Sequence, residues 1–182
     1  MHVLVIIVSD THSVLDARIA SLARMSDFAV HAGDIGSLQV LHALKPRQGV
    51  VAVRGNNDTP DKWPAGEQDA LATLPFETRL ELPGGYLQVL HGDRAGRPQG
   101  LHARLRMRYA DARAIVYGHS HRLVCDCAQL PWVLNPGAAG RQRTYGGPSC
   151  LVLRASARQW DVEARRFDPL PAHPAPMKNK RI

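Results

Sequence analysis

The chain has 182 residues, of which 45% are hydrophobic and 21% charged, and its net charge is +7. This length fits one domain with a hydrophobic core, and the apolar content excludes a chain that is disordered throughout. No apolar run approaches the roughly 20 residues that cross a bilayer, and the run at residues 3–8 is too short for a signal peptide. We therefore expect a soluble, cytoplasmic protein without a membrane partner.

Residues 1–167 are expected to form a single domain, followed by a proline-rich basic C-terminal tail at 168–182. The segment after Asp168 reads Pro-Leu-Pro-Ala-His-Pro-Ala-Pro and is followed by three basic residues. Such a composition is typical of an extended segment rather than a packed element. A solvated tail is favoured over one that contacts nucleic acid or anionic lipid.

Apolar runs alternate with helical patterns through the first third of the chain. The expected order is a strand at 3–8, a helix at 14–25, a strand at 28–32, a helix at 38–44 that Ser37 can cap, and a strand at 50–53. This β-α-β-α-β order predicts a parallel sheet. Residues 59–75 contain several Pro and Gly residues and are expected to form a surface excursion.

The second half of the chain is richer in strand signals. A hairpin is expected at 77–82 and 86–90, then a basic helix near 99–110, a strand at 114–117 and a β-rich remainder at 123–167. The arginines around the basic helix favour a solvated face over a phosphate-binding one.

Polar residues capable of binding metal follow these strands directly. They are Asp10, His12, Asp34, Asn56, His91, His119 and His121. Ligands gather at the carboxyl ends of strands in parallel sheets, and oxygen donors mixed with imidazoles suit divalent transition ions. Seven ligands are too many for one catalytic ion, so the set predicts two ions. Such a pair shares a carboxylate and activates a bridging hydroxide as the nucleophile.

Five short motifs carry a family resemblance. They are Asp10-x-His12, Gly33-Asp34, Gly55-Asn56-x-Asp58, His91-Gly92 and Gly118-His119-x-His121, supported by Val53-Arg54-Gly55-Asn56 and Asn135-Pro136-Gly137. Over about residues 1–165 the chain resembles the calcineurin-like metallophosphoesterases, and most closely the small phosphodiesterases of the YfcE type. The resemblance implies an α/β fold, a four-layer αββα sandwich of two mixed sheets flanked by helices. It also implies hydrolysis of phosphodiester bonds at a dinuclear centre.

The same resemblance divides the ligands between the two ions. It implies that Asp10, His12 and His121 hold the first ion, that Asn56, His91 and His119 hold the second, and that Asp34 bridges them. Manganese is the expected metal, with iron, zinc, cobalt and nickel as alternatives.

Two positions depart from the family pattern. Asn57 stands where many larger members have a histidine proposed to protonate the leaving group, and an amide cannot do so near neutral pH. Asp93 stands where close relatives often have a second histidine. Diesters with acidic leaving groups, such as aryl diesters, are therefore favoured over alkyl monoesters. Residues expected to support the ligands or contact substrate are Asn57, Asp58, Arg94 and Asn135.

The remaining candidate metal-binding residues have structural interpretations. His31, His42 and His102 fall inside expected strands or helices. Cys125 and Cys127 could form half of a zinc site, but no second pair completes it, so reduced cysteines on one strand face are favoured.

The sequence is also compatible with other functions. A eukaryotic retromer subunit shares the implied fold and acts as a scaffold, although it lacks several of the histidines. The net positive charge allows a nucleic-acid phosphoesterase, which is not favoured because only 5% of residues are aromatic. The expected partner is thus a small phosphodiester substrate, and a homo-oligomer stays an open alternative.

Overall fold

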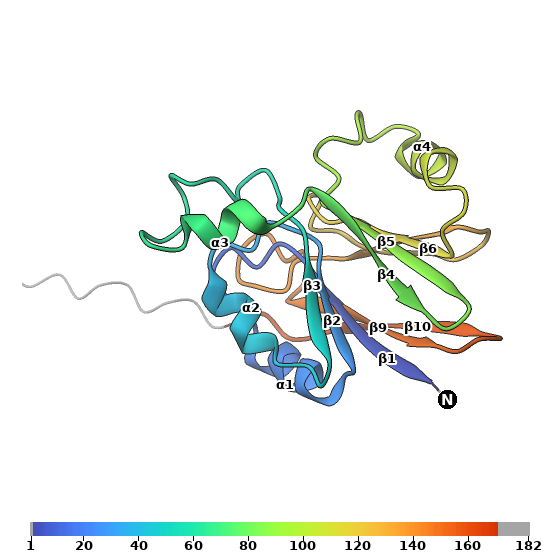
Figure 1. Ribbon diagram of the computed structural model, residues 1–182, viewed down its shortest axis with the longest axis horizontal. Helices are drawn as coiled ribbons and strands as arrows, with labels where there is room; N and C mark the ends of the chain where they lie inside the picture. Colours follow the sequence, from blue (N-terminus) through green and yellow to red (C-terminus); the bar gives the residue numbers. More distant parts are fainter. Residues whose placement is uncertain (1, 171–182) are drawn as a thin grey trace, which may run out of the picture.

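The computed structural model describes residues 2–170 and contains two five-stranded sheets that pack face to face (Figure 1). The strands are β1 (Val3–Val8), β2 (Phe28–His31), β3 (Gly49–Ala52), β4 (Glu77–Leu82), β5 (Gly85–Leu90), β6 (Ala114–Val116), β7 (Leu123–Asp126), β8 (Trp132–Pro136), β9 (Ser149–Ala155) and β10 (Trp160–Arg166). The helices are α1 (Ala17–Met25), α2 (Leu38–Leu44), α3 (Gln68–Thr73) and α4 (Leu101–Arg108). Most of the expected tail, 168–182, lies outside the described residues.

Both sheets are mixed. The first has the order β10-β9-β1-β2-β3, and the second β4-β5-β6-β8-β7. In the first sheet β1, β2 and β3 are parallel, as the β-α-β-α-β order predicts, while β9 runs antiparallel to both of its neighbours, β1 and β10. In the second, β5, β6 and β8 are parallel, and β4 and β7 run antiparallel at the two edges.

Helices cover the outer face of each sheet, so the expected four-layer αββα sandwich is confirmed (Figure 1). β1 shows why its sequence is continuously apolar. Val5 and Ile7 pack between the two sheets, whereas Ile6 and Val8 pack on the opposite face with Ile19 of α1. Alternate side chains of a strand point to opposite faces, and here both faces are buried.

The second sheet is covered by α4. Leu105 of α4 packs against Ile115 of β6 and Val133 of β8. Among the described residues, no helix is long and apolar enough to cross a membrane.

Two local predictions were wrong. Helix α1 begins at Ala17 rather than residue 14, because Asp16 caps it by accepting a hydrogen bond from the Arg18 amide at 2.8 Å. Ser37 makes no side-chain cap for α2, and Glu67 instead accepts from the Leu38 amide at 2.7 Å. Glu67 immediately precedes α3, a short helix inside the segment expected to be a surface excursion.

Candidate metal centre

The loops that follow β1, β2, β3, β5 and β6 meet at one end of the sandwich and bring together all seven predicted ligands. Parallel register aligns the ends of neighbouring strands, with Val8 of β1 beside His31 of β2, and His31 beside Ala52 of β3. Backbone hydrogen bonds then join the loops: the Asp10 amide donates to Gly33 at 3.0 Å, and the Gly118 amide to His91 at 2.9 Å.

One group of donors consists of Asp10, His12, Asp34 and His121, whose ligand atoms all lie within 4.8 Å of one another. Nε2 of His121 is 3.3 Å from Oδ1 of Asp10 and 3.3 Å from Nε2 of His12. The Oδ1 atom of Asp10 is buried and accepts no hydrogen bond. A buried carboxylate oxygen facing two imidazoles suits a divalent cation, so these residues fit a metal ion.

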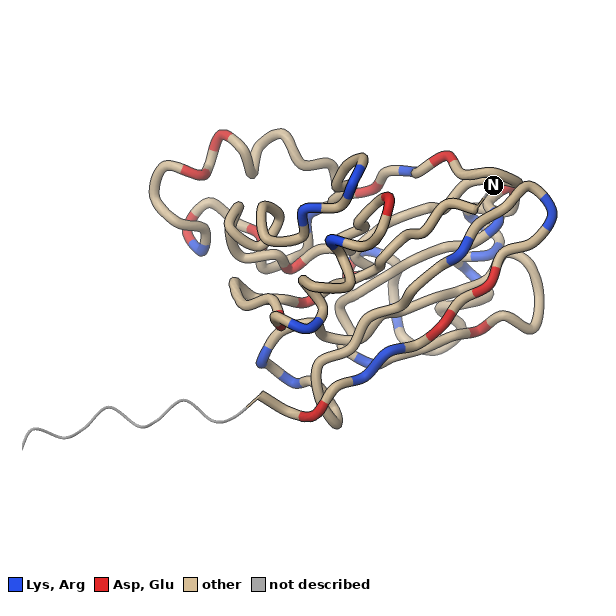
Figure 2. The backbone as a smooth tube through the Cα atoms, turned by 90° about the horizontal axis from the view of Figure 1, so that it is seen from below, with Lys and Arg blue, Asp and Glu red and all other residues tan. Residues whose placement is uncertain are grey.

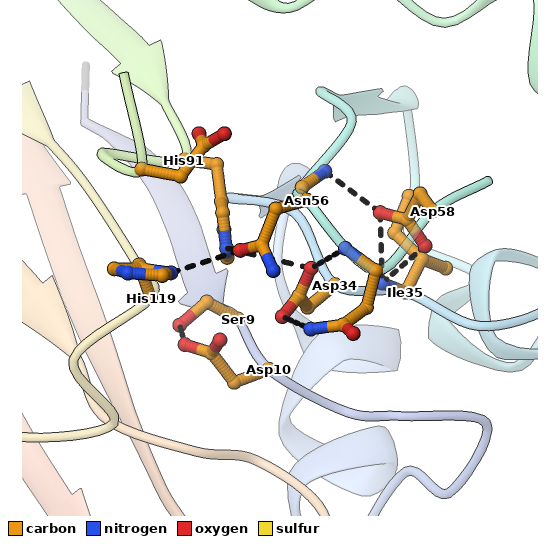
Figure 3. A network of polar contacts seen from close by, with 12 residues as sticks. Ser9, Asp10, Asp34, Ile35, Asn56, Asp58, His91 and His119 are labelled. Carbon is orange, nitrogen blue, oxygen red and sulfur yellow. Dashed lines mark hydrogen bonds and ion pairs between the residues drawn. The ribbon is translucent and has the colours of Figure 1, made fainter. Parts of the chain in front are cut away.

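A second group gathers around the side-chain oxygen of Asn56 (Figure 3). This Oδ1 lies 2.9 Å from Nδ1 of His119 and 3.2 Å from Nε2 of His91. Asp34 belongs to both groups, because its Oδ1 is 3.4 Å from Nε2 of His91 and its Oδ2 is 3.8 Å from Nε2 of His12. One carboxylate therefore stands between two sets of donors.

Backbone carbonyls orient two of the imidazoles. Nδ1 of His91 donates to the Ala32 carbonyl at 2.8 Å, and Nδ1 of His121 donates to the Gln142 carbonyl at 3.1 Å. Nε2 of each ring then faces the carboxylates and offers its lone pair to a metal ion when it is deprotonated. Such contacts fix the tautomer of metal-binding histidines.

The loop backbone is strained at the ligands themselves. Five of them have a left-handed backbone, with φ of 53° at Asp10, 45° at His12, 55° at Asp34, 65° at His119 and 56° at His121. This region costs a non-glycine residue about 1–3 kcal/mol and persists where the surroundings enforce it, commonly at functional sites. No sequence pattern predicted these left-handed conformations.

Two glycines allow the ligands to approach closely. A Cβ at Gly55 would lie 2.1 Å from Oδ1 of Asp34, and a Cβ at Gly33 would lie 2.6 Å from Nδ1 of His91. Larger residues there would displace the side chains, which explains why glycine precedes Asp34 and Asn56 in the motifs.

Burial and neighbouring charges shift the ionisation of the acidic ligands and of His91. Burial raises the pKa of Asp10 to about 7. Burial also acts to raise the pKa of Asp34, but the hydrogen bond and charge of His91 and the hydrogen bonds of Asn57 outweigh it and lower that pKa. Burial acts to lower the pKa of His91, yet the Asp34 carboxylate prevails and raises it to about 9.

The other imidazoles are held neutral. Burial lowers the pKa of His121 to about 4 and also lowers the pKa values of His12 and His119. Neutral imidazole is the form that binds metal.

Asp58 and Asn135 support the ligand loops. The Asp58 carboxylate, 3% exposed, accepts hydrogen bonds from the amides of Ile35, Gly36 and Gly55 and from the Trp63 indole. Fully buried Asn135 donates to the Gly118 carbonyl at 2.9 Å and to Oγ of Ser120 at 3.1 Å. Both side chains thus fix loops rather than reach the donor groups.

Asn57 lies directly beside Asp34. Its backbone amide and its Nδ2 donate to the two Asp34 oxygens at 2.8 and 2.7 Å, and its Oδ1 accepts from Nζ of Lys62 at 2.7 Å. His12, Asp34, Asn57 and Lys62 line one cavity of about 280 Å³. Sequence reasoning missed Lys62, because it lies in the irregular segment after β3 and belongs to no motif.

Two arginines also lie near the donors. Arg143, missed from the sequence, donates to Nε2 of His121 at 2.9 Å. Arg94, expected to contact substrate, stacks 3.5 Å above the ring of Phe76 and lines a separate cavity of about 520 Å³ with His91. The structure therefore places Arg94 on the same cavity as His91, and this cavity is distinct from the one at His12 and Asp34.

Among the described residues, His31, His102, Cys125 and Cys127 do not belong to the two donor groups. His31 is fully buried with Nε2 2.9 Å from Oγ1 of Thr11, and His102 contacts Asp126 and Tyr117. Cys125 and Cys127 are free, Cys125 being exposed and Cys127 partly buried.

The family follows from comparison with known sequences. A family model described as the calcineurin-like phosphoesterase superfamily domain matches residues 3–158. This chain belongs to that superfamily. The implied resemblance is thereby confirmed, and a candidate divalent-metal site on this fold supports a phosphoesterase.

Individual relatives agree with this assignment. The chain is 29% identical over 140 residues to a protein of Methanocaldococcus jannaschii named a probable metallophosphoesterase, a match covering 72% of this chain and 66% of that protein. It therefore spans slightly less than two thirds of the length of that relative.

Solved structures share the fold. Zinc-bound Vps29 of Entamoeba histolytica is 17% identical with a TM-score of 0.66, covering 91% of this chain and 98% of that chain. A structure described as a novel archaeal phosphodiesterase is 21% identical with a TM-score of 0.65, covering 89% of this chain and 99% of that one.

Proposed function

We propose that this protein is a phosphodiesterase that works with two divalent metal ions, manganese being the expected one. The observation that carries the proposal is the position of Asp34, whose two oxygens face different donor groups. Two ions sharing one carboxylate would lie about 3.5–4 Å apart, neutralise phosphoryl charge and lower the pKa of the attacking water.

The proposed ligand sets follow these donor groups. Asp10, His12 and His121 would hold one ion, Asn56, His91 and His119 the other, with Asp34 between them. The cavity of about 280 Å³ at His12 and Asp34 is the proposed entrance for the phosphate.

Two cations near the donor groups would attract the anionic substrate. The ammonium of Lys62 is exposed and lines this cavity, and Arg143 lies against His121. Positive groups of this kind stabilise charge that develops on a transferring phosphoryl group. Asp58 and Asn135 keep the ligand loops in place.

Asn57 supports the proposed preference for acidic leaving groups. Its amide is held between Asp34 and Lys62 by hydrogen bonds of 2.7 Å each, and an amide does not supply a proton near neutral pH. Aryl diesters, whose leaving groups need little protonation, should therefore be better substrates than alkyl monoesters.

The test is turnover by the manganese-loaded protein on a panel containing an aryl diester, an aryl monoester and an alkyl monoester. We expect the aryl diester to be hydrolysed fastest. Asp34→Asn should reduce this activity by more than about 100-fold, because losing a direct ligand exceeds the 10–100-fold cost of losing a residue that supports one. Asp69→Asn, at an exposed position in α3, is the matched control.

The alternatives predict different results. A scaffold, suggested by the similarity to Vps29, would bind metal and hydrolyse no ester. A nucleic-acid phosphoesterase would hydrolyse oligonucleotides faster than small aryl diesters. Basic and acidic residues are interspersed along the described chain (Figure 2), which supports a small substrate over a polyanion.

A further inference from the structure

A second cavity, of about 260 Å³, lies between α4 and the loop that follows β6. Gly118, His119 and Ser120 form one of its walls. His119 also contacts Asn56 in the second donor group. The cavity therefore adjoins the place where the proposed centre would hold a phosphate.

Its other walls are largely apolar. They include Leu101 at the start of α4, the Tyr117 side chain and Val124 of β7, with Asp93 and Arg122 as the charged members. Gly92 and Gly96 add surface without side chains, which leaves room for a flat group to approach. Apolar walls beside a polar centre are typical of sites that bind the organic part of a ligand.

Among the polar side chains in the wall, His102 has a hydrogen-bond partner at each ring nitrogen. Its Nδ1 lies 2.8 Å from Oδ2 of Asp126, and its Nε2 lies 3.1 Å from the Tyr117 hydroxyl. Arg106, one helical turn further along α4, is 2.8 Å from the same Asp126 oxygen. With both nitrogens occupied, His102 joins α4 to β7 and fixes Tyr117, so the wall is rigid and selects by shape.

Size limits what can enter. Sites for drug-sized ligands measure about 300–1,000 Å³, and this cavity is smaller. A single ring system fits that volume, whereas a run of stacked nucleotides does not. A ring is also preferred over an alkyl chain, because aromatic pairs gain binding energy beyond the area they bury and Tyr117 supplies a partner ring.

We propose that this cavity binds one aromatic arm of the phosphodiester substrate while the phosphate lies at the adjoining metal centre. The proposal rests on the proposed function and specifies its substrate class: a diester with at least one arm that ends in a single aromatic ring. It is independent of leaving-group acidity, because it concerns binding of the ring.

Non-hydrolysable phosphonates allow binding of the ring to be measured separately from hydrolysis. Titration calorimetry on the manganese-loaded protein compares phenylphosphonate with methylphosphonate, which share the phosphonate group. Burial of the ring predicts that phenylphosphonate binds roughly tenfold more tightly. Val124→Phe, which fills the cavity, should bring the two affinities to within about twofold. Met107→Phe, at a position of α4 that is 81% exposed and does not line the cavity, should keep the tenfold ratio.

A second measurement does not depend on the folding of a variant. In the zinc-loaded parent protein, phenylphosphonate should shift the methyl NMR signals of Leu101 and Val124, and methylphosphonate should shift them much less. Equal affinities of the two phosphonates, or unshifted methyl signals, would overturn the subsite. If diesters were still hydrolysed, the proposed function would stand without it. If neither phosphonate bound, the subsite would fail too, and metal content and turnover would decide whether the proposed function failed with it.

Discussion

The guanidinium of Arg143 donates a hydrogen bond to Nε2 of His121 at 2.9 Å, and this is the nitrogen that faces Asp10 Oδ1 at 3.3 Å. An ion bound by His121 would need the same lone pair. Arg143 therefore has to move aside when a metal binds, and its charge then lies close to the ion. Such a charge weakens cation binding and strengthens phosphate binding.

Removal of this charge should have two opposite effects. Arg143→Ala should raise manganese affinity by roughly threefold to tenfold, because a neighbouring positive charge no longer repels the ion. The KM for a diester should rise, because the phosphate loses a cation. Calorimetry and steady-state kinetics measure both quantities, with Arg24→Ala on α1 as the control. Weaker metal binding in Arg143→Ala would show that the arginine supports the ligand set instead.

Lys62 is expected to contribute to catalysis through the phosphate. Lys62→Met should lower kcat/KM for an aryl diester by roughly tenfold, because a positive group beside the phosphoryl oxygens is lost. The metal content should stay unchanged, since Lys62 contacts Asn57 rather than a ligand. Lys45→Met, at the end of α2, is the matched control. Parent-level kinetics in Lys62→Met would exclude contact between this lysine and the substrate.

Asp58 should determine the stability of the ligand loops. Asp58→Asn keeps the side-chain shape but replaces one accepting oxygen with a donor that faces backbone amides. We expect a loss of about 2–4 kcal/mol in the free energy of unfolding, because buried donors lose a charged acceptor. Chemical denaturation of the metal-free protein measures this loss against Asp69→Asn. A loss below that of the control would argue against Asp58 as the anchor of these loops.

Metal and protons should compete for the same residues. In the metal-free protein, protonated His91 contributes stability that is complete below its unfolded pKa of 6.5 and is lost as pH rises through about 9. Asp10 acts in the same direction: its pKa rises from 3.8 to about 7 on folding, so ionisation within that interval destabilises the fold. The lowered pKa values of His12, His119 and His121 act in the opposite direction, but only up to about their ordinary pKa of 6.5. From about pH 7 to pH 9 the metal-free protein should therefore become less stable.

Added metal should reverse this trend. Its ligands must be deprotonated, so the increase in Tm on adding manganese should grow with pH over the same interval. Calorimetric scans with and without a chelator test this. A Tm increase that does not vary with pH would contradict proton competition at these residues.

Much of the fold could be predicted because each signal is local. The continuous apolar run of β1 and the alternation with helices indicate a parallel sheet, and Asp10, Asp34 and Asn56 follow its strands directly. The pairing of β1 with β9, far along the chain, could not be read from periodicity. The short helix α3 could not be predicted, because the Pro and Gly residues around it are typical of an irregular segment.

The candidate centre, like the fold, could be predicted from the sequence only in part. Residue type and position predicted the seven donor residues, whereas the left-handed backbone of five of them depends on the packing of loops from different strands. Arg143 and Lys62 belong to no motif, and only the folded chain brings them to His121 and Asn57. The anchoring role of Asp58 likewise depends on amides of residues 35, 36 and 55.

The proposed function requires that Asp34 lies between two metal positions. Crystals of the manganese-loaded protein, measured at the manganese absorption edge, test it most directly. We expect two anomalous peaks about 3.5–4 Å apart, one among Asp10, His12 and His121 and the other among Asn56, His91 and His119, with one Asp34 oxygen between them. A single peak at full manganese occupancy, or two peaks without Asp34 between them, would contradict it.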